Sequence, residues 1–230
     1  MNDTNTLFQS NEATKPGFLV AEVSTCPSIQ FFNVDCMDFM RSKPDKYYDL
    51  AVVDPPYGID RLHTGGMPKK HGFKNWERKL WDKEKPTKEY WEELFRVSKN
   101  QIVWGGNYFT EHLPNSMGWV FWFKQKGMTF ADGELAWTSF NKATRQYDLD
   151  GMGGGNRIHP TQKPIDLYRW LLQNYTQKGM KILDTHGGSM SSAIACDMEG
   201  YDLDICEIDL EYFTNGVKRF KEYKSQQRLF

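Results

Sequence analysis

An acidic tetrapeptide with two prolines is the segment of this chain best suited to chemistry. Asp54-Pro55-Pro56-Tyr57 follows the apolar run Leu50 to Val53. Such a run is typical of a buried parallel strand that stops at the open edge of an α/β sheet. The two prolines fix their φ angles and offer carbonyls without competing N–H groups. We therefore expect a rigid set of hydrogen-bond acceptors beside an aromatic ring, suited to holding an exocyclic amino group on a flat ring.

A glycine-rich segment near the end of the chain is the second candidate. Asp184-Thr185-His186-Gly187-Gly188-Ser189 follows a short apolar run and opens a predicted helix. Backbone N–H groups at a helix N-terminus could cradle a cofactor there. About twenty residues later Glu207 ends the next predicted strand, where a carboxylate can accept hydrogen bonds from ribose hydroxyls. No G-x-G-x-x-G follows a predicted strand, which disfavours a nicotinamide dehydrogenase.

Composition narrows the class of protein. The chain has 230 residues, a formal net charge of −1, and 39% hydrophobic and 15% aromatic residues. These values fit one folded α/β domain, with any nucleic acid bound through a local basic surface. No segment approaches the roughly 20 apolar residues of a membrane span, and we see no secretory pattern at the N-terminus. The cysteines (Cys26, Cys36, Cys196 and Cys206) lack C-x-x-C spacing, so we expect reduced thiols, no metal and a cytoplasmic location.

The elements that must position these residues alternate along the chain. Apolar runs predict strands at 29–34, 50–53, 101–104, 119–123, 134–138, 181–183 and 203–206. Helical periodicity predicts helices near 37–41, then at 87–97 with Thr87 as its cap, and at 165–175, 191–199 and 210–224. The alternation predicts a doubly wound, mostly parallel, Rossmann-like sheet. We expect a flexible arm at 1–28, one domain at 29–224 with insertions at about 59–90 and 124–155, and a tail at 225–230.

The order of the functional segments indicates a circular permutation. In a nucleotide-binding sheet the glycine-rich loop and the ribose-binding acid ordinarily come first, whereas here they come last. No further strand with its own terminal acid fits after residue 224. The segment from Phe31 to Asp35 is therefore expected to supply that strand from the other end of the chain.

Motif by motif, residues 30 to 224 resemble the amino-group DNA methyltransferases, in the permuted order of their β group. The resemblance rests on Asp54 to Tyr57, on His159-Pro160-Thr161-Gln162-Lys163-Pro164, and on the glycine-rich loop. It implies a methyltransferase fold and S-adenosylmethionine as cofactor, with N6 of adenine or N4 of cytosine as the methylated atom. It assigns catalysis to Asp54, Pro55, Pro56 and Tyr57, and cofactor binding to Asp35, Thr161, Lys163, Asp184, Gly187, Gly188, Ser189 and Glu207.

Within this assignment Asp35 would contact the cofactor adenine, and Thr161 and Lys163 would bind its carboxylate or a nearby phosphate. His159 could instead be structural. The family loop usually reads Asp-Pro-Phe-x-Gly-Ser-Gly, whereas here Thr185-His186 replace Pro-Phe and Met190 replaces the last glycine. A weakened relative that binds cofactor and DNA without turnover is therefore an alternative.

The implied reaction is direct methyl transfer to an amine. The Asp54 carboxylate and the Pro55 carbonyl would accept its two N–H hydrogens, which stabilises the charge that grows on nitrogen. Tyr57 would stack on a base flipped out of the duplex, or pack against the following helix. Aspartate at the head of the tetrapeptide favours N6-adenine in DNA. N4-cytosine is the first alternative, and RNA or a protein glutamine is a further one.

Double-stranded DNA is expected to contact residues 59–90, where nine lysines and arginines outnumber the acidic residues. The candidate phosphate contacts are Lys69, Lys70, Lys74, Arg78 and Lys79, with Phe73, Trp76 and Trp81 interleaved. A solvated loop with its aromatic residues anchored in the core is the alternative. Residues 124–155 form a second candidate for sequence readout, and Gly105-Gly106-Asn107 suits a close backbone approach or a plain turn.

The last five residues, Gln226-Gln227-Arg228-Leu229-Phe230, are similar to the short peptides with which bacterial proteins dock on the replication sliding clamp. A tail folded back onto its own domain is the alternative. The sequence leaves open a homodimer and a restriction partner.

Overall fold

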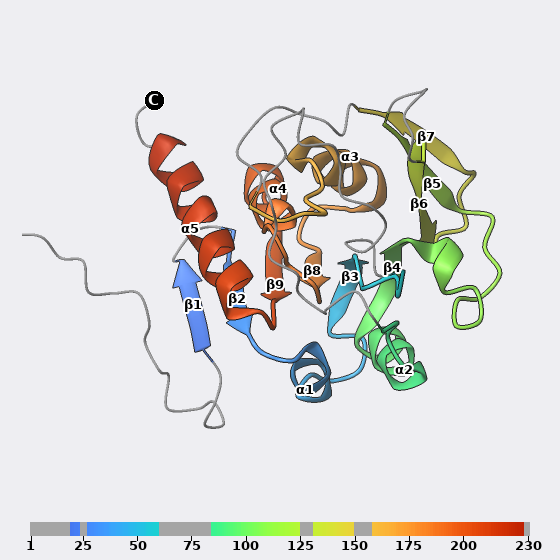
Figure 1. Cartoon of the computed structure of the whole chain (residues 1–230), viewed down its shortest axis with the longest axis horizontal. Coiled ribbons are helices and arrows are strands. Elements are labelled where there is room, and N and C mark those ends of the chain that lie inside the picture. The colour runs from blue at the N-terminus through green and yellow to red at the C-terminus, as the bar shows by residue number, and fades with distance from the viewer. Residues whose placement is uncertain (1–18, 24–26, 60–83, 125–130, 150–157, 228–230) are drawn as a thin grey trace, which may run out of the picture.

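The computed structural model describes residues 19–23, 27–59, 84–124, 131–149 and 158–227. Within these residues nine strands form one sheet in the order β1-β2-β9-β8-β3-β4-β6-β5-β7 (Figure 1). The strands are β1 (Leu19–Val23), β2 (Ile29–Asn33), β3 (Tyr48–Val53), β4 (Ser98–Trp104), β5 (Trp119–Phe123), β6 (Gly133–Thr138), β7 (Arg145–Asp148), β8 (Lys181–Asp184) and β9 (Asp202–Cys206). The helices are α1 (Cys36–Arg41), α2 (Lys88–Val97), α3 (Ile165–Tyr175), α4 (Ser191–Glu199) and α5 (Leu210–Gln227), with a short 3-10 turn η3 (Gly106–Tyr108).

Five neighbouring strands, β2, β9, β8, β3 and β4, run parallel to one another. Beyond β4 the sheet continues with antiparallel β6 and β5, and β7 pairs parallel with β5. The predicted doubly wound, mostly parallel sheet is therefore confirmed. So is the predicted neighbour of β9, because Phe31 in β2 lies opposite Ile205 in a parallel pair.

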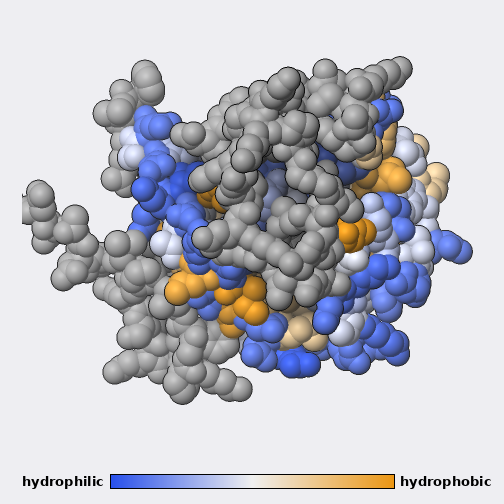
Figure 2. Space-filling view, viewed as in Figure 1, coloured by the Kyte–Doolittle hydropathy of each residue, from blue (hydrophilic) through white to orange (hydrophobic). Residues whose placement is uncertain are grey.

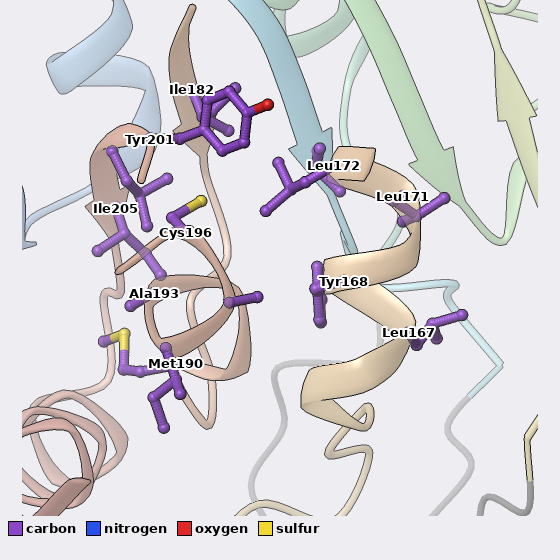
Figure 3. Packing of buried hydrophobic residues seen from close by; sticks show 14 of the residues in the cluster. Leu167, Tyr168, Leu171, Leu172, Ile182, Met190, Ala193, Cys196, Tyr201 and Ile205 are labelled. Atoms are coloured by element: carbon purple, nitrogen blue, oxygen red, sulfur yellow. The ribbon is translucent and has the colours of Figure 1, made fainter. Parts of the chain in front are cut away.

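The hydrophobic core has two layers, one on each face of this sheet. Alternate residues of a strand point to opposite faces, so Leu50 and Val52 join one layer while Ala51 and Val53 join the other. Helices α3, α4 and α5 cover the first face, and α1 and α2 cover the second (Figure 1). Figure 3 shows part of the first layer, with Leu171 and Leu172 of α3, Ala193 of α4 and Ile182 of β8 among its labelled side chains.

Strand β1 corrects the expectation of a flexible arm over residues 1–28 for its own five residues, Leu19–Val23. It pairs antiparallel with β2, with Leu19 opposite Asn33 and Val23 opposite Ile29. The physical reason lies in β2, whose outer N–H and C=O groups would otherwise form an unpaired sheet edge. Edge pairing depends on a distant partner and so leaves little local signature.

Two smaller details also differ from the sequence-based expectations. Strand β7 was not predicted, because its residues are polar and largely exposed and carry no hydrophobic alternation. Thr87 stands at the cap position of α2, but its side chain makes no capping hydrogen bond; its backbone carbonyl accepts from Tyr90 N at 3.1 Å.

No helix in the described part of the chain is long and apolar enough to cross a membrane. Among the same residues there is no group of three His, Cys, Asp or Glu side chains placed to hold a metal ion. Cys36, Cys196 and Cys206 are free thiols, and Cys26 lies outside the described residues.

Candidate active site

The candidate site lies along one edge of the sheet, where the carboxyl ends of four parallel strands meet. Asp35 follows β2, Asp54 follows β3, Asp184 ends β8 and Glu207 follows β9. Because these strands are adjacent and parallel, their ends share one edge even though the residues are far apart in sequence. The structure thus brings the predicted catalytic loop and the predicted cofactor loop together.

The predicted catalytic tetrapeptide, residues 54–57, is held in place by its own tyrosine. Tyr57 donates a hydrogen bond from its hydroxyl to Asp54 Oδ1 at 2.7 Å. Burial, followed by the charges of Asp54 and Glu134, raises the pKa of Tyr57 well above its ordinary value. Its hydroxyl therefore stays protonated and remains a donor to the carboxylate.

The ring of Tyr57 is placed by the turn after β4. It stacks on Tyr108 with centroids 5.0 Å apart and an interplanar angle of 17°. Gly105 has φ +66°, and a Cβ there would lie 2.3 Å from the Tyr57 ring. The close backbone approach expected at Gly105 is therefore an approach to Tyr57.

Lys163 contacts the carboxylate of Asp54. Its ammonium forms an ion pair with Asp54 Oδ2, lies 3.4 Å from Glu134 Oε2, and its side chain is only 4% exposed. Glu134 in turn pairs with Lys124. The sequence had suggested the cofactor carboxylate or a phosphate as the partner of Lys163. Glu134 and Lys124 were missed, because single charged residues on β6 and just after β5 carry no motif.

Asp184 accepts two hydrogen bonds that hold the glycine-rich loop and the helix after it. One carboxylate oxygen accepts from His186 N at 3.0 Å and the other from the Ser192 hydroxyl at 2.6 Å. Burial is the largest cause that raises the pKa of Asp184 to about 7, with smaller upward contributions from Asp54 and Glu207. One oxygen of this predicted cofactor ligand thus binds the loop, and the other binds the first turn of α4.

Glu207 and Asp35 also bind backbone. Glu207 accepts from Gly188 N and from Asp209 N, each at 2.8 Å, so it connects the glycine-rich loop to the start of α5. Asp35 caps α1 by accepting from Met37 N at 2.7 Å. The predicted residues Gly187, Gly188 and Ser189 all belong to this loop, and Ser189 Oγ lies 3.0 Å from Ser191 Oγ.

The segment from His159 to Pro164 packs against the same loop. The His159 ring lies edge-on to Tyr212 at 4.3 Å, and a Cβ on Gly188 would lie 3.6 Å from it. Thr161 Oγ1 lies 3.1 Å from His159 Nδ1. These contacts give His159 and Thr161 a structural role beside the loop, while cofactor binding by Thr161 stays a prediction.

His186 occupies the place of the family phenylalanine. Its Nδ1 lies 2.8 Å from Thr185 Oγ1, which lies 2.8 Å from the Tyr90 hydroxyl. Burial lowers the pKa of His186 to about 4, with opposing contributions from Asp54 and Asp35. The imidazole is therefore neutral at pH 7. Tyr90, on α2, was not predicted as part of the site.

The predicted DNA contacts and most of the predicted clamp-binding tail stay predictions. Lys69, Lys70, Lys74, Arg78 and Lys79 lie outside the described residues, as do residues 228–230 of the tail. Gln226 and Gln227 form the end of α5.

A doubly wound sheet with acidic residues at four adjacent strand ends and a glycine-rich loop defines the class of nucleotide-cofactor α/β enzymes. The particular family follows from a match to the model of the DNA methylases acting at N6 and N4 positions, which covers residues 101–218, just over half of the chain. This chain belongs to that DNA methylase family. It is also similar to the candidate methylase YubD of Escherichia coli (strain K12), with 23% identity over 83% of this chain and 89% of the relative.

Two examples illustrate the solved structures that share this fold. The PvuII DNA methyltransferase (cytosine-N4-specific) matches with a TM-score of 0.58 and 12% identity, over 84% of this chain and 86% of that one. The complex of M1.HpyAVI with SAM matches with a TM-score of 0.54 and 18% identity, over 83% and 99%. Identities this low support the arrangement of the sheet and helices.

Proposed function

We propose that this protein transfers a methyl group from S-adenosylmethionine to the N6 amino group of adenine in double-stranded DNA, at a specific sequence. The observation that carries the proposal is the position of Asp54. Its carboxylate stands at the carboxyl end of β3, next to the strand that leads into the glycine-rich loop, and is oriented by the Tyr57 hydroxyl at 2.7 Å.

The residues at the sheet edge fit a cationic nucleoside cofactor. Asp54 and Glu207 lie close enough to Asp184 to raise its pKa, so the edge is rich in carboxyl groups. Such groups suit a sulfonium and accept hydrogen bonds from ribose hydroxyls. After Glu207, Ile208 and Leu210 are 66% and 59% exposed, and hydrophobic surface is visible beside the start of α5 in Figure 2. We assign the ribose to Glu207 and the flat adenine ring to the Ile208 side.

S-Adenosylmethionine, when bound, supplies a methyl group made electrophilic by its positively charged sulfur. Asp54 and the Pro55 carbonyl hold the two N–H hydrogens of the target amine, which directs the nitrogen lone pair away from the base ring. The carboxylate then stabilises the positive charge that grows on nitrogen during transfer, and it can accept the proton that the methylated nitrogen releases. Holding both reactants in this orientation contributes much of the rate.

The target base must leave the duplex to reach Asp54, at a cost of a few kcal/mol. Tyr57 is the proposed stacking partner, and its ring is already held by Tyr108 and Gly105. The basic residues of 59–90 are the proposed contacts to DNA phosphates.

The experiment is methylation of genomic DNA by the purified protein, followed by nucleoside mass spectrometry and sequencing with modified-base detection. The proposal expects 6-methyladenine at one short sequence, and Asp54→Ala should abolish it while still binding cofactor. The similarity to a cytosine-N4-specific enzyme makes N4-methylcytosine the second candidate. An Asp54→Ala variant that methylates near the wild-type rate would reject the mechanism.

A sliding clamp is the proposed second partner, bound through residues 226–230. Deletion of these residues should abolish binding of the protein to a purified clamp and leave cofactor binding unchanged. Equal clamp affinity of the full and shortened chains would reject this partner.

A further inference from the structure

Lys163 is an ammonium group enclosed between two carboxylates. Its side chain is 4% exposed, whereas those of Asp54 and Glu134 are each 17% exposed. Its Nζ also lies 5.2 Å from the Trp104 ring centroid and 3.5 Å from the Tyr57 hydroxyl oxygen. A lysine this buried requires a compensating anion, and here two are within reach.

The contact with Asp54 opposes the use of that carboxylate in catalysis. Oδ1 of Asp54 accepts from Tyr57 and Oδ2 faces Lys163, so both oxygens are already engaged. An arriving amine must share or displace one of these donors. A positive charge on Lys163 would also repel the charge that grows on the amine nitrogen during transfer.

Glu134 offers the ammonium a second position. Oε2 of Glu134 is 3.4 Å from Lys163 Nζ. Glu134 lies on β6, an interior strand of the sheet, and is paired with Trp122 of β5. A small movement of the lysine head toward Glu134 would release Asp54 without moving the ammonium into water or leaving it unpaired. Lys124, paired with the other oxygen of Glu134, keeps the group of four charges neutral.

We propose that Lys163 is a positioning residue shared between Asp54 and Glu134, and that Glu134 draws it off the catalytic carboxylate when the target amine binds. The inference rests on the proposed function and names residues that act through Asp54. In the absence of DNA the lysine holds the Asp54 carboxylate in place through their ion pair.

The first test is the neutral variant Glu134→Gln. Without the second carboxylate, Lys163 stays on Asp54, so the single-turnover rate of methyl transfer should fall about tenfold or more. Cofactor affinity measured by calorimetry should remain within about twofold of wild type, because the changed group acts on Asp54. Adding Lys163→Met to Glu134→Gln should raise the rate above that of Glu134→Gln alone, since the inhibiting ammonium is gone.

The matched control is Glu92→Gln, which removes the same charge from the exposed pair of Glu92 with Lys88 on α2. It should leave both the rate and the cofactor affinity unchanged. An unchanged rate in Glu134→Gln, or no recovery in the double variant, overturns the proposal. A loss of cofactor affinity of about tenfold in Lys163→Met also overturns it, by assigning the lysine to the cofactor carboxylate.

A second measurement needs no activity. Thermal unfolding of Asp54→Asn, Lys163→Met and the double variant, without cofactor, forms a double-mutant cycle. Removing one partner of a buried pair leaves the other charge without its compensation, so Asp54→Asn and Lys163→Met should each lower Tm. The double variant should lower Tm by less than the sum of the two single shifts. Additive shifts overturn the shared ion pair. Absence of DNA methylation by the wild-type protein would instead reject the proposed function, and the cycle would still decide the contact.

Discussion

Met190 and Gly216 fit together as a pair across the glycine-rich loop and α5. Met190 has φ +57°, a left-handed conformation that favours glycine, and its side chain is fully buried. Gly216 lies in the middle of α5, where a Cβ would lie 2.4 Å from Met190 Cγ. The glycine that the family places at the end of the loop is thus absent, and a glycine on the neighbouring helix makes room for the side chain that replaced it.

Gly216→Ala tests this pairing. Alanine in a helix is favoured over glycine by about 1 kcal/mol, but overpacking against Met190 should cost more, for a net loss of roughly 1–2 kcal/mol. In a Met190→Gly background the clash with Met190 is absent and the Cβ meets only the Gly188 carbonyl oxygen, at 3.3 Å, so the same substitution should be less destabilising. Urea unfolding of the four proteins measures both effects. Equal effects of Gly216→Ala in the two backgrounds would show that the residues do not interact.

Gly105→Ala should displace the ring of Tyr57. The added Cβ meets the Tyr57 ring at 2.3 Å, and φ +66° is strained for alanine. We expect a loss of about 1–3 kcal/mol in stability and at least about a tenfold lower rate of methyl transfer, since Tyr57 orients Asp54. Gly179→Ala is the control: its φ is also positive, at +84°, but a Cβ there would meet no atom within 4 Å. A rate loss in both variants would assign the effect to backbone strain in general.

Glu207→Gln should separate the two roles of that carboxylate. The amide oxygen can replace one acceptor, for Gly188 N or for Asp209 N, but the negative charge is lost. We expect cofactor affinity to fall about tenfold in calorimetry, with a larger loss in Glu207→Ala, where the loop also loses its anchor. Unchanged affinity in both variants would reject the ribose assignment.

His186→Phe should reveal how Asp184 makes the free energy of unfolding depend on pH. Burial raises the pKa of Asp184 to about 7 in the folded state. Between about pH 4 and 7 the folded state therefore binds one more proton at this group than the unfolded state, and the free energy of unfolding falls as pH rises. His186 acts oppositely: its pKa is lowered to about 4, so the unfolded state binds the extra proton and stability rises between about 4 and 6.5. The two slopes largely cancel in the wild-type protein.

With phenylalanine at position 186, the slope from Asp184 remains alone. Stability should then fall by roughly 1 kcal/mol per pH unit between about pH 4.5 and 6.5. Unfolding in urea across this range measures the slope, and Asp184→Asn should reverse its sign when His186 is kept. A flat profile in His186→Phe would show that Asp184 is ionised throughout.

The principal elements around the site were predictable from short segments. Helices α3 and α4 begin and end at the predicted residues, because their apolar spacing and flanking Pro164 and Gly200 are local signals. The ends of β3, β8 and β9 were predicted for the same reason, and with them the shared edge of Asp54, Asp184 and Glu207. Strand β7 and the pairing of β1 were not, since an edge strand depends on its neighbour more than on its own sequence.

The sequence by itself determined the doubly wound sheet, its permuted order and the acids at its edge, because hydrophobic runs and the residues that end them act locally. Only the tertiary structure decided which groups these acids meet. The ion pair of Lys163 with Asp54 joins residues far apart in the chain, as does the fit of Met190 to Gly216. The physical reason is burial. A buried ammonium, or a buried methionine with a left-handed backbone conformation, is tolerated only where the surrounding fold supplies its partner.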